Sequence, residues 1–200
     1  MIEGFEFFKG FLDPKAQRDL VKALRGIIDA APLYTPLMPR SGRPFSVRMT
    51  NAGPLGWVSD KTGGYRYQPQ HPVSGLPWPA FPPSLLGIWR EVSNWDQEPE
   101  ACLVNYYGPG AKLGAHVDQD EAAEEAPVVS VSLGDEAVFF VGGLKRADKK
   151  TRFHLKSGDV VVLGGAARRA YHGIDRVMAG SSDLLDEGGR FNLTLRRVTL

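Results

Sequence analysis

Apolar residues recur at helical spacing in two stretches of the first hundred residues. The first stripe consists of Leu20, Val21, Leu24, Ile27 and Ile28, and the second of Leu85, Ile88, Trp89, Val92 and Trp95. Such three-and-four spacing is typical of one buried helix face. Asp13 can cap the first helix and Pro14 is tolerated at its first position, so we expect this helix to run to about Ala30. The second helix is expected to begin after Ser84.

Proline dominates the segment between these two stripes. Residues 32–83 contain eleven of the fifteen prolines of the chain. Regular secondary structure is therefore not expected to dominate there, and a long irregular segment in a compact domain is usually functional or mobile. We interpret it as a substrate-binding lid.

From residue 101 onward the pattern changes to short β-rich runs separated by glycine or acidic turns. The expected strands are 101–107, 112–118, 128–133, 137–142, 151–156, 159–163, 168–173 and 190–198. About eight short strands without helical patterns between them favour a sandwich, jelly roll or barrel. The expected fold class is mainly β (α+β): an antiparallel double-stranded β-helix, or jelly roll, flanked by N-terminal helices and the Pro-rich lid.

Length and composition favour a single domain of 200 residues, with helices and lid in 1–100 and the β core in 101–200. No internal repeat, apolar membrane-spanning run or secretory leader is found, so we expect a cytoplasmic monomer without a membrane partner. Cys102 is the only cysteine, which excludes an internal disulfide and a multi-cysteine zinc site. Any metal is then held by His and carboxylate.

The formal net charge of +1 does not indicate a nucleic-acid partner, but the charge distribution does. Residues 31–90 hold six Lys or Arg against the single acid Asp60, interleaved with aromatic residues. A surface that contacts a single strand or a flipped base needs this combination. Taken alone, the pattern fits equally well a Pro-rich segment whose aromatics pack onto the domain.

The segment 190–196 alternates polar and apolar residues. In a strand, Arg190, Asn192, Thr194 and Arg196 all face one side. Two buried arginines on that face are costly without anionic partners, and a small dicarboxylate can supply partners for both. This strand is therefore expected to form half of a ligand site.

His116 and Asp118 are two residues apart and share one side of a strand, and a rolled sheet can bring His172 to face them. Two His and one carboxylate form the facial triad of non-haem Fe(II) oxygenases. A His-x-Asp pair also arises by chance on a surface hairpin, and such a triad can hold Zn²⁺ in a hydrolase. The strand with two arginines favours the oxygenase. His71 and His154 are interpreted as structural or solvent-facing.

Several motifs together resemble the AlkB family of Fe(II)- and 2-oxoglutarate-dependent dioxygenases, over residues from about Phe45 to Arg196. They are Met49-Thr50-Asn51, Leu55-Gly56-Trp57, Pro77-Trp78-Pro79, Cys102 to Tyr107, Pro109 to Leu113, His116-Val117-Asp118, Val129 to Gly134, Gly142 to Arg146, Gly158 to Val162, Tyr171-His172-Gly173 and Arg190-x-Asn192-x-Thr194-x-Arg196. The last motif is the specific one, because the triad alone marks the whole dioxygenase superfamily.

The resemblance implies that His116, Asp118 and His172 ligate catalytic Fe(II), with 2-oxoglutarate and O₂ as co-substrates. Arg190 then pairs with the distal carboxylate of 2-oxoglutarate, and Arg196 lies nearer the keto-acid end. The implied co-substrate pocket consists of Asn105, Tyr106, Tyr107, Arg190, Asn192, Thr194 and Arg196.

The family also implies an activity: oxidative demethylation of 1-methyladenine or 3-methylcytosine in single-stranded DNA or RNA, with formation of succinate and formaldehyde, in the repair of alkylation damage. Trp57 and Tyr65 are candidates to hold the flipped base, and Tyr67 to make a backbone or phosphate contact. Asp120 is a candidate to meet the charged base, and Arg146 to contact the substrate. Without the resemblance, a solvated acidic turn is the simpler interpretation of Asp120. Turnover of RNA, protein or a small molecule, and a jelly-roll binding module without turnover, remain the alternatives.

Overall fold

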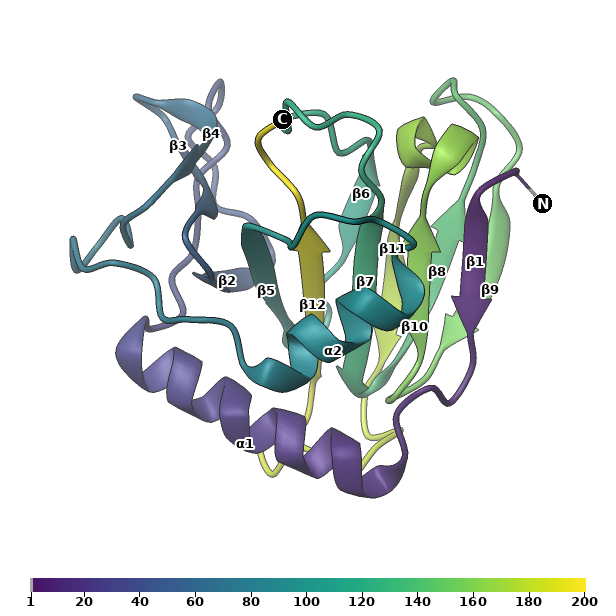
Figure 1. Ribbon diagram of the computed structural model, residues 1–200, viewed down its shortest axis with the longest axis horizontal. Coiled ribbons are helices and arrows are strands. Elements are labelled where there is room, and N and C mark those ends of the chain that lie inside the picture. The colour runs from purple at the N-terminus through teal and green to yellow at the C-terminus, as the bar shows by residue number, and fades with distance from the viewer. Residues whose placement is uncertain (1) are drawn as a thin grey trace.

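The computed structural model describes residues 2–200 and contains two β-sheets that pack face to face, with two helices on the outer side of the larger one (Figure 1). The larger sheet has the strand order β1-β10-β7-β12-β5-β2, and the smaller one β6-β11-β8-β9. The strands of the larger sheet are β1 (Phe5–Phe8), β10 (Val160–Leu163), β7 (Val128–Gly134), β12 (Arg190–Arg196), β5 (Ala101–Tyr107) and β2 (Arg48–Ala52). Those of the smaller sheet are β6 (Leu113–His116), β11 (His172–Met178), β8 (Glu136–Val141) and β9 (Thr151–Leu155). This arrangement confirms the predicted jelly roll.

Strict alternation along the central strands separates two interiors. On β12, Phe191, Leu193 and Leu195 belong to the apolar cluster beneath the helices, whereas Arg190 and Arg196 line a cavity between the sheets. Strand β12 pairs along all seven of its residues with β5 on one side and β7 on the other. Its register is therefore fixed from both sides, since a slip by one residue would bury the arginines among the apolar residues.

Both predicted helices are present. Helix α1 (Pro14–Ala30) begins as expected: the carboxylate of Asp13 accepts a hydrogen bond of 2.7 Å from the backbone N–H of Ala16. Helix α2 (Pro83–Val92) ends at Val92, so Trp95 lies beyond it and contributes to the cluster only as a partly buried side chain. Within residues 2–200, neither helix has the length and apolar character needed to cross a membrane.

The Pro-rich segment contains more regular structure than its sequence indicates. Strand β2 pairs with β5 in the larger sheet, and β3 (Gly56–Asp60) with β4 (Gly64–Gln68) forms a separate hairpin that projects beyond the sheets (Figure 1). Because β1 and β2 extend the larger sheet, its pairings cross the expected division at residue 100. His71 is structural, as expected: it is buried and its Nε2 lies 2.8 Å from the carbonyl of Pro32.

Two predicted strands are wrong in their bounds. Strand β6 ends at His116, so Val117 and Asp118 lie in the following loop rather than on the strand. The run 168–173 is divided between a 3₁₀ helix, η1 (Gly165–Arg169), and the start of β11, which continues to Met178. Short β-rich runs do not distinguish these alternatives, because the preference for a strand depends on its packing partners. Strand β1 was not predicted at all.

Candidate metal and co-substrate site

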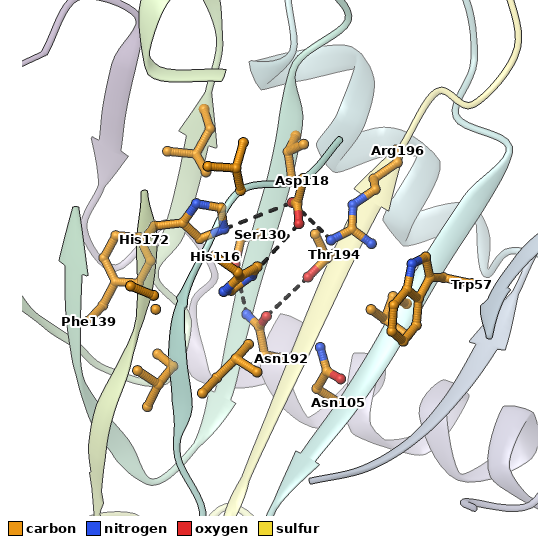
Figure 2. Close-up of a pocket in the computed structure, with 18 of the residues that line it drawn as sticks. Trp57, Asn105, His116, Asp118, Ser130, Phe139, His172, Asn192, Thr194 and Arg196 are labelled. Carbon is orange, nitrogen blue, oxygen red and sulfur yellow. Dashed lines mark hydrogen bonds and ion pairs between the residues drawn. The ribbon is translucent and has the colours of Figure 1, made fainter. Parts of the chain in front are cut away.

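A cavity of about 360 Å³ opens between the two sheets, and the polar face of β12 forms one wall of it (Figure 2). The opposite wall comes from the smaller sheet and includes Phe139 and His172. The rim is formed in part by the β3–β4 hairpin and by the loop that follows β6. The cavity thus collects polar side chains that are far apart in the sequence.

The sheet pairing brings His116, Asp118 and His172 together. His116 ends β6 and His172 begins β11, and the two residues are direct cross-strand partners with ring centroids 4.4 Å apart. Asp118 lies between them: its Oδ1 is 3.7 Å from Nε2 of His116 and its Oδ2 is 3.9 Å from Nε2 of His172. One ligand atom from each side chain lies within 4.8 Å of the others, so the three can bind one metal ion.

Backbone carbonyls orient both imidazole rings. Nδ1 of His116 lies 2.9 Å from the carbonyl of Gly114, and Nδ1 of His172 lies 3.0 Å from that of Ala170. A carbonyl can only accept, so each Nδ1 carries a proton, and each Nε2, on the side of Asp118, is the atom left to bind a metal ion. Burial, and then the neighbouring His116, lower the pKa of His172 to about 4. His172 is therefore neutral at pH 7, as metal binding requires.

Gly173 allows the close approach of β6 to β11 beside the triad. A Cβ atom at this position would lie 2.5 Å from the carbonyl oxygen of Leu113 and 2.7 Å from the ring of Phe140. The register between the two strands shifts between His172 and Ile174 at the same point. Any side chain here would separate the strands that carry the two histidines.

Arg196 is paired with carboxylates of the protein itself. Its Nη2 donates to Oδ2 of Asp118 at 2.9 Å, and its Nε lies 3.3 Å from Oε1 of Glu121. Burial alone would raise the pKa of Asp118, but the guanidinium of Arg196 and the two imidazoles outweigh burial and hold this pKa well below its usual range. Asp118 is therefore ionised, and Arg196 holds one of its oxygens. The prediction was that a dicarboxylate supplies anionic partners for both arginines, but Arg196 already has two within the protein.

Arg190 lies in a different environment. Its side chain is fully buried, and its Nη2 donates to the hydroxyl of Ser132 at 2.7 Å. Its Nη1 is 3.4 Å from the carbonyl of Asp135, and its Nε has no hydrogen-bond partner among residues 2–200. Burial lowers the pKa of Arg190 to about 10, so the guanidinium is still charged at pH 7. A buried cation with an unpaired donor at the cavity wall favours a bound anion.

The middle of the polar face consists of neutral hydrogen-bonding groups. Thr194 donates to Asn192 at 3.1 Å, and Asn192 donates to the hydroxyl of Ser130 at 2.7 Å (Figure 2). Asn105 is the cross-strand partner of Asn192, and Tyr107 that of Arg190, and both line the cavity. The structure thus brings together every expected co-substrate residue except one.

Tyr106 is the exception, and its expected place in the pocket is wrong. Its ring packs against Phe191, with centroids 4.9 Å apart, on the helix-facing side of the sheet. Its hydroxyl donates to the carbonyl of Gly188 at 3.3 Å. Because alternate residues of a strand face opposite sides, a strand that directs Asn105 and Tyr107 into the cavity directs Tyr106 away from it.

Three of the expected substrate residues meet at the rim. Trp57 and Tyr65 stack on each other at 5.4 Å, and Nε1 of Trp57 donates to Oδ2 of Asp120 at 2.7 Å. Asp120 is exposed and, like Asp118, follows the end of β6, so it reaches the rim from a loop and not by continuing the strand. Arg146 is exposed and also lines the cavity, from the loop between β8 and β9.

Tyr67 is half-buried, and its hydroxyl points inward rather than toward the expected backbone or phosphate contact. Its hydroxyl donates to Oε1 of Glu121 at 2.5 Å, and burial raises the pKa of Tyr67 well above its usual value. Glu121 itself is buried and not part of a solvated acidic loop. Tyr67 thus anchors the hairpin inward.

The sequence interpretation also missed three polar residues of the site. Ser130 and Ser132 carry hydroxyls that bind Asn192 and Arg190, and their alternation on 128–133 was the available signal. Arg168 forms a buried ion pair of 2.9 Å with Glu121 and also donates to the carbonyl of Asp118 at 2.6 Å. Nothing in the local sequence distinguishes this buried arginine from the exposed Arg169 beside it.

Comparison with known proteins agrees with this geometry. A profile of the 2OG-Fe(II) oxygenase superfamily matches residues 4–196. The "Alpha-ketoglutarate-dependent dioxygenase AlkB homolog" of Caulobacter vibrioides is 48% identical over 198 residues, which cover 99% of this chain and 89% of that protein. The "Alpha-ketoglutarate-dependent dioxygenase AlkB" of Escherichia coli is 42% identical over 187 residues, covering 92% of this chain and 85% of that one.

Among solved structures, "The structure of OsALKBH1" superposes with a TM-score of 0.82 at 30% sequence identity, covering 98% of both chains. The likeness extends over both sheets and the helices that flank them.

Proposed function

Because the chain belongs to the AlkB family of Fe(II)- and 2-oxoglutarate-dependent dioxygenases, we propose that it removes N-linked methyl groups from alkylated nucleobases, such as 1-methyladenine and 3-methylcytosine, in single-stranded DNA or RNA. O₂ is the oxidant: one oxygen atom enters succinate as 2-oxoglutarate loses CO₂, and the other leaves with the methyl carbon as formaldehyde. The single observation that carries the co-substrate part is Arg190, a buried cation at the cavity wall without an anionic partner of its own.

The donor set of the triad fits Fe(II). Two imidazole nitrogens and one carboxylate are suited to a divalent first-row metal and leave coordination positions open. The rings of His116 and His172 are held by carbonyls, and the second oxygen of Asp118 by Arg196, so the three ligands are preorganised. When bound there, Fe(II) supplies the activation of O₂ that lets a carbon–hydrogen bond of the methyl group be oxidised.

The co-substrate pocket discriminates by charge. The distal carboxylate of 2-oxoglutarate accepts from the guanidinium of Arg190, which Ser132 holds in place. Asn105, Tyr107 and Asn192 contribute polar groups along the molecule, and Arg196 lies at the end nearer the triad. The residues of β12 thus fix which end of the dicarboxylate faces the metal site.

The rim is suited to a flat, positively charged base. Trp57 and Tyr65 offer aromatic faces, and the carboxylate of Asp120 lies beside the indole of Trp57. A base methylated at N1 of adenine or N3 of cytosine carries a positive charge that Asp120 can meet, while the aromatic faces hold its plane. Arg146 at the same rim can contact the phosphate backbone.

Single-stranded substrate follows from the position of the methyl group. It lies on the pairing edge of the base, so the base must be unpaired or extruded before it can reach a cavity between two sheets. The protein's part is then to orient base and co-substrate and to exclude water from the space between them.

Mass spectrometry of an oligonucleotide with one 1-methyladenine, incubated with Fe(II)-loaded protein and oxygen, tests the proposal. Loss of one methyl mass that requires 2-oxoglutarate, with succinate and formaldehyde formed, is the expected result. Succinate without demethylation moves the substrate to protein or a small molecule. A sample that makes neither product is a binding module and contradicts the proposal. Matched DNA and RNA oligonucleotides determine the preferred strand.

Assembly and location are separate parts of the proposal. We propose that the protein is a monomer and acts in the cytoplasm. Both helices pack onto the larger sheet and cover its outer face, which supports the monomeric state. Light scattering after size-exclusion chromatography gives the molar mass in solution, to be compared with 21.9 kDa for one chain.

A further inference from the structure

Glu121 is a buried carboxylate that three separate elements contact. Tyr67 of β4 donates to its Oε1, Arg168 of η1 pairs with its Oε2 at 2.9 Å, and Nε of Arg196 on β12 lies 3.3 Å from its Oε1. Only 2% of its side chain is exposed, whereas Glu124 in the same loop is 61% exposed. Burying a carboxylate is costly unless it is paired, so Glu121 can occupy this position only because Tyr67, Arg168 and Arg196 surround it.

The contacts of Glu121 form a continuous path from the hairpin to the metal site. Tyr67 lies on β4, in the hairpin that also carries Trp57 and Tyr65. Its hydroxyl contacts Glu121, Glu121 faces Arg196, and Arg196 donates to Oδ2 of Asp118 at 2.9 Å. The first and last links are hydrogen bonds, and the middle link, between Glu121 and Arg196, is an ion pair without hydrogen-bond geometry. All three join buried or half-buried groups, where electrostatic contacts are stronger than in water.

We propose that Glu121 is a positioning residue that couples the β3–β4 hairpin to Asp118 through Arg196. The hydroxyl of Tyr67 and the guanidinium of Arg196 share one oxygen, Oε1. When the hairpin moves and withdraws Tyr67, that oxygen becomes fully available to Arg196, and the hold of Arg196 on Asp118 changes. Arg168 keeps Glu121 itself in place, because it pairs with the other oxygen.

Two substitutions separate the links of this path. Tyr67→Phe removes only the hydrogen bond that joins the hairpin to Glu121. Tyr106→Phe is its matched control, since it removes a similar tyrosine hydrogen bond on the opposite side of the larger sheet. Glu121→Gln keeps an oxygen that can accept but removes the charge that Arg196 and Arg168 face. Glu124→Gln is its control, because Glu124 pairs with Arg169 at the surface.

Hydrogen exchange of the metal-free protein is the first measurement, because it does not depend on any activity. Both Tyr67→Phe and Glu121→Gln should increase amide exchange in residues 56–68 by about tenfold, the change that loss of about 1.4 kcal/mol produces. The two controls should leave exchange in this segment unchanged. Equal exchange in all four variants and the unsubstituted chain would overturn the proposal.

Turnover gives the second measurement, and this part rests on the proposed function. Tyr67→Phe should raise KM for the methylated oligonucleotide several-fold. It should also weaken Co(II), used as a spectroscopic probe of the triad, by a few-fold, because loss of the Tyr67 hydroxyl alters the hold of Arg196 on Asp118. Glu121→Gln should weaken Co(II) as well, by about tenfold, as loss of a group behind a metal ligand does.

The outcomes keep the two proposals apart. If the unsubstituted protein shows no demethylation but the exchange and Co(II) results hold, the proposed function fails and the coupling stands. If activity in both variants falls only in proportion to the folded fraction, with no separate change in KM or Co(II) affinity, Glu121 has a purely structural role and the coupling is wrong.

Discussion

Arg190 and Arg196 stand on the same face of β12, six residues apart, and both are buried at the wall of one cavity. Arg196 faces two carboxylates of its own chain, Asp118 and Glu121. Arg190 has a serine hydroxyl and a distant carbonyl instead, and it forms no ion pair with a carboxylate of residues 2–200. Two side chains of the same type thus have different roles: Arg196 holds carboxylates of the protein in place, and Arg190 is available to bind an anionic ligand. Charge balance distinguishes them where residue type does not.

The largest effect on turnover is expected from removing the charge of Asp118, the member of the triad that pairs with Arg196. Asp118→Asn should lower turnover on the order of 1000-fold or more, because the metal loses an anionic ligand and Arg196 loses a partner. Succinate formation at saturating Fe(II) measures it. Asp175→Asn, which breaks only an ion pair with Arg152 at the surface, should leave turnover unchanged. Activity retained in Asp118→Asn would remove Asp118 from the metal site.

The next largest effect is expected on the free energy of unfolding, which should depend on Arg196 and not on Arg190. Arg196→Met should lower the free energy of unfolding by about 3–5 kcal/mol, because Asp118 and Glu121 remain buried without their shared partner. Arg190→Met should change it by less than about 1 kcal/mol, or raise it, since a buried charge without an anionic partner is removed. Chemical denaturation of the metal-free proteins gives both values. Equal losses for the two variants would contradict the comparison.

The affinity for 2-oxoglutarate should depend strongly on Arg190, although the stability of the protein does not. Arg190→Met should weaken binding of 2-oxoglutarate by about 2–4 kcal/mol, the loss expected for a buried bidentate ion pair. Calorimetric titration of the metal-loaded protein under anaerobic conditions measures it. Arg152→Met is the control, because Arg152 lies on the outer side of the smaller sheet in a surface pair. Unchanged affinity in Arg190→Met would exclude Arg190 from the pocket.

The smallest effect is expected from Ser132, which contacts Arg190 and is not expected to contact 2-oxoglutarate itself. Ser132→Ala removes the hydroxyl that holds Nη2 of Arg190, without removing the charge. The dissociation constant of 2-oxoglutarate should then rise about fivefold, equivalent to about 1 kcal/mol. The same titration detects it. A loss as large as that of Arg190→Met would mean that Ser132 itself contacts the co-substrate.

Alternation explains why much of the site was predictable. The period of two along 101–107 and 190–196 places Asn105, Tyr107, Arg190 and Asn192 on one face, and both strands have the expected starts. The same rule excludes Tyr106, which the family motif had brought into the pocket as part of a continuous run. The geometric rule was the more reliable guide at this position.

Loops account for what was not predictable. Asp118, Asp120 and Glu121 all follow the end of β6, where no period determines which side chain points inward. Glu121 is buried because Arg168 and Arg196, 47 and 75 positions later, converge on it, and no local pattern contains that information. Residues 168 and 169, which end the 3₁₀ helix, were predicted as part of a strand for the same reason.

The central place of β12 also has a consequence for synthesis. Its neighbours β5 and β7 are made earlier but contact each other only through β12, which pairs fully with both. A nascent chain that has reached residue 189 therefore carries two unpaired strand edges and no arginine face. Translation arrested there should give a product prone to aggregation rather than a weakened enzyme. The chain can bind 2-oxoglutarate only after β12 has been synthesised and has paired with β5 and β7.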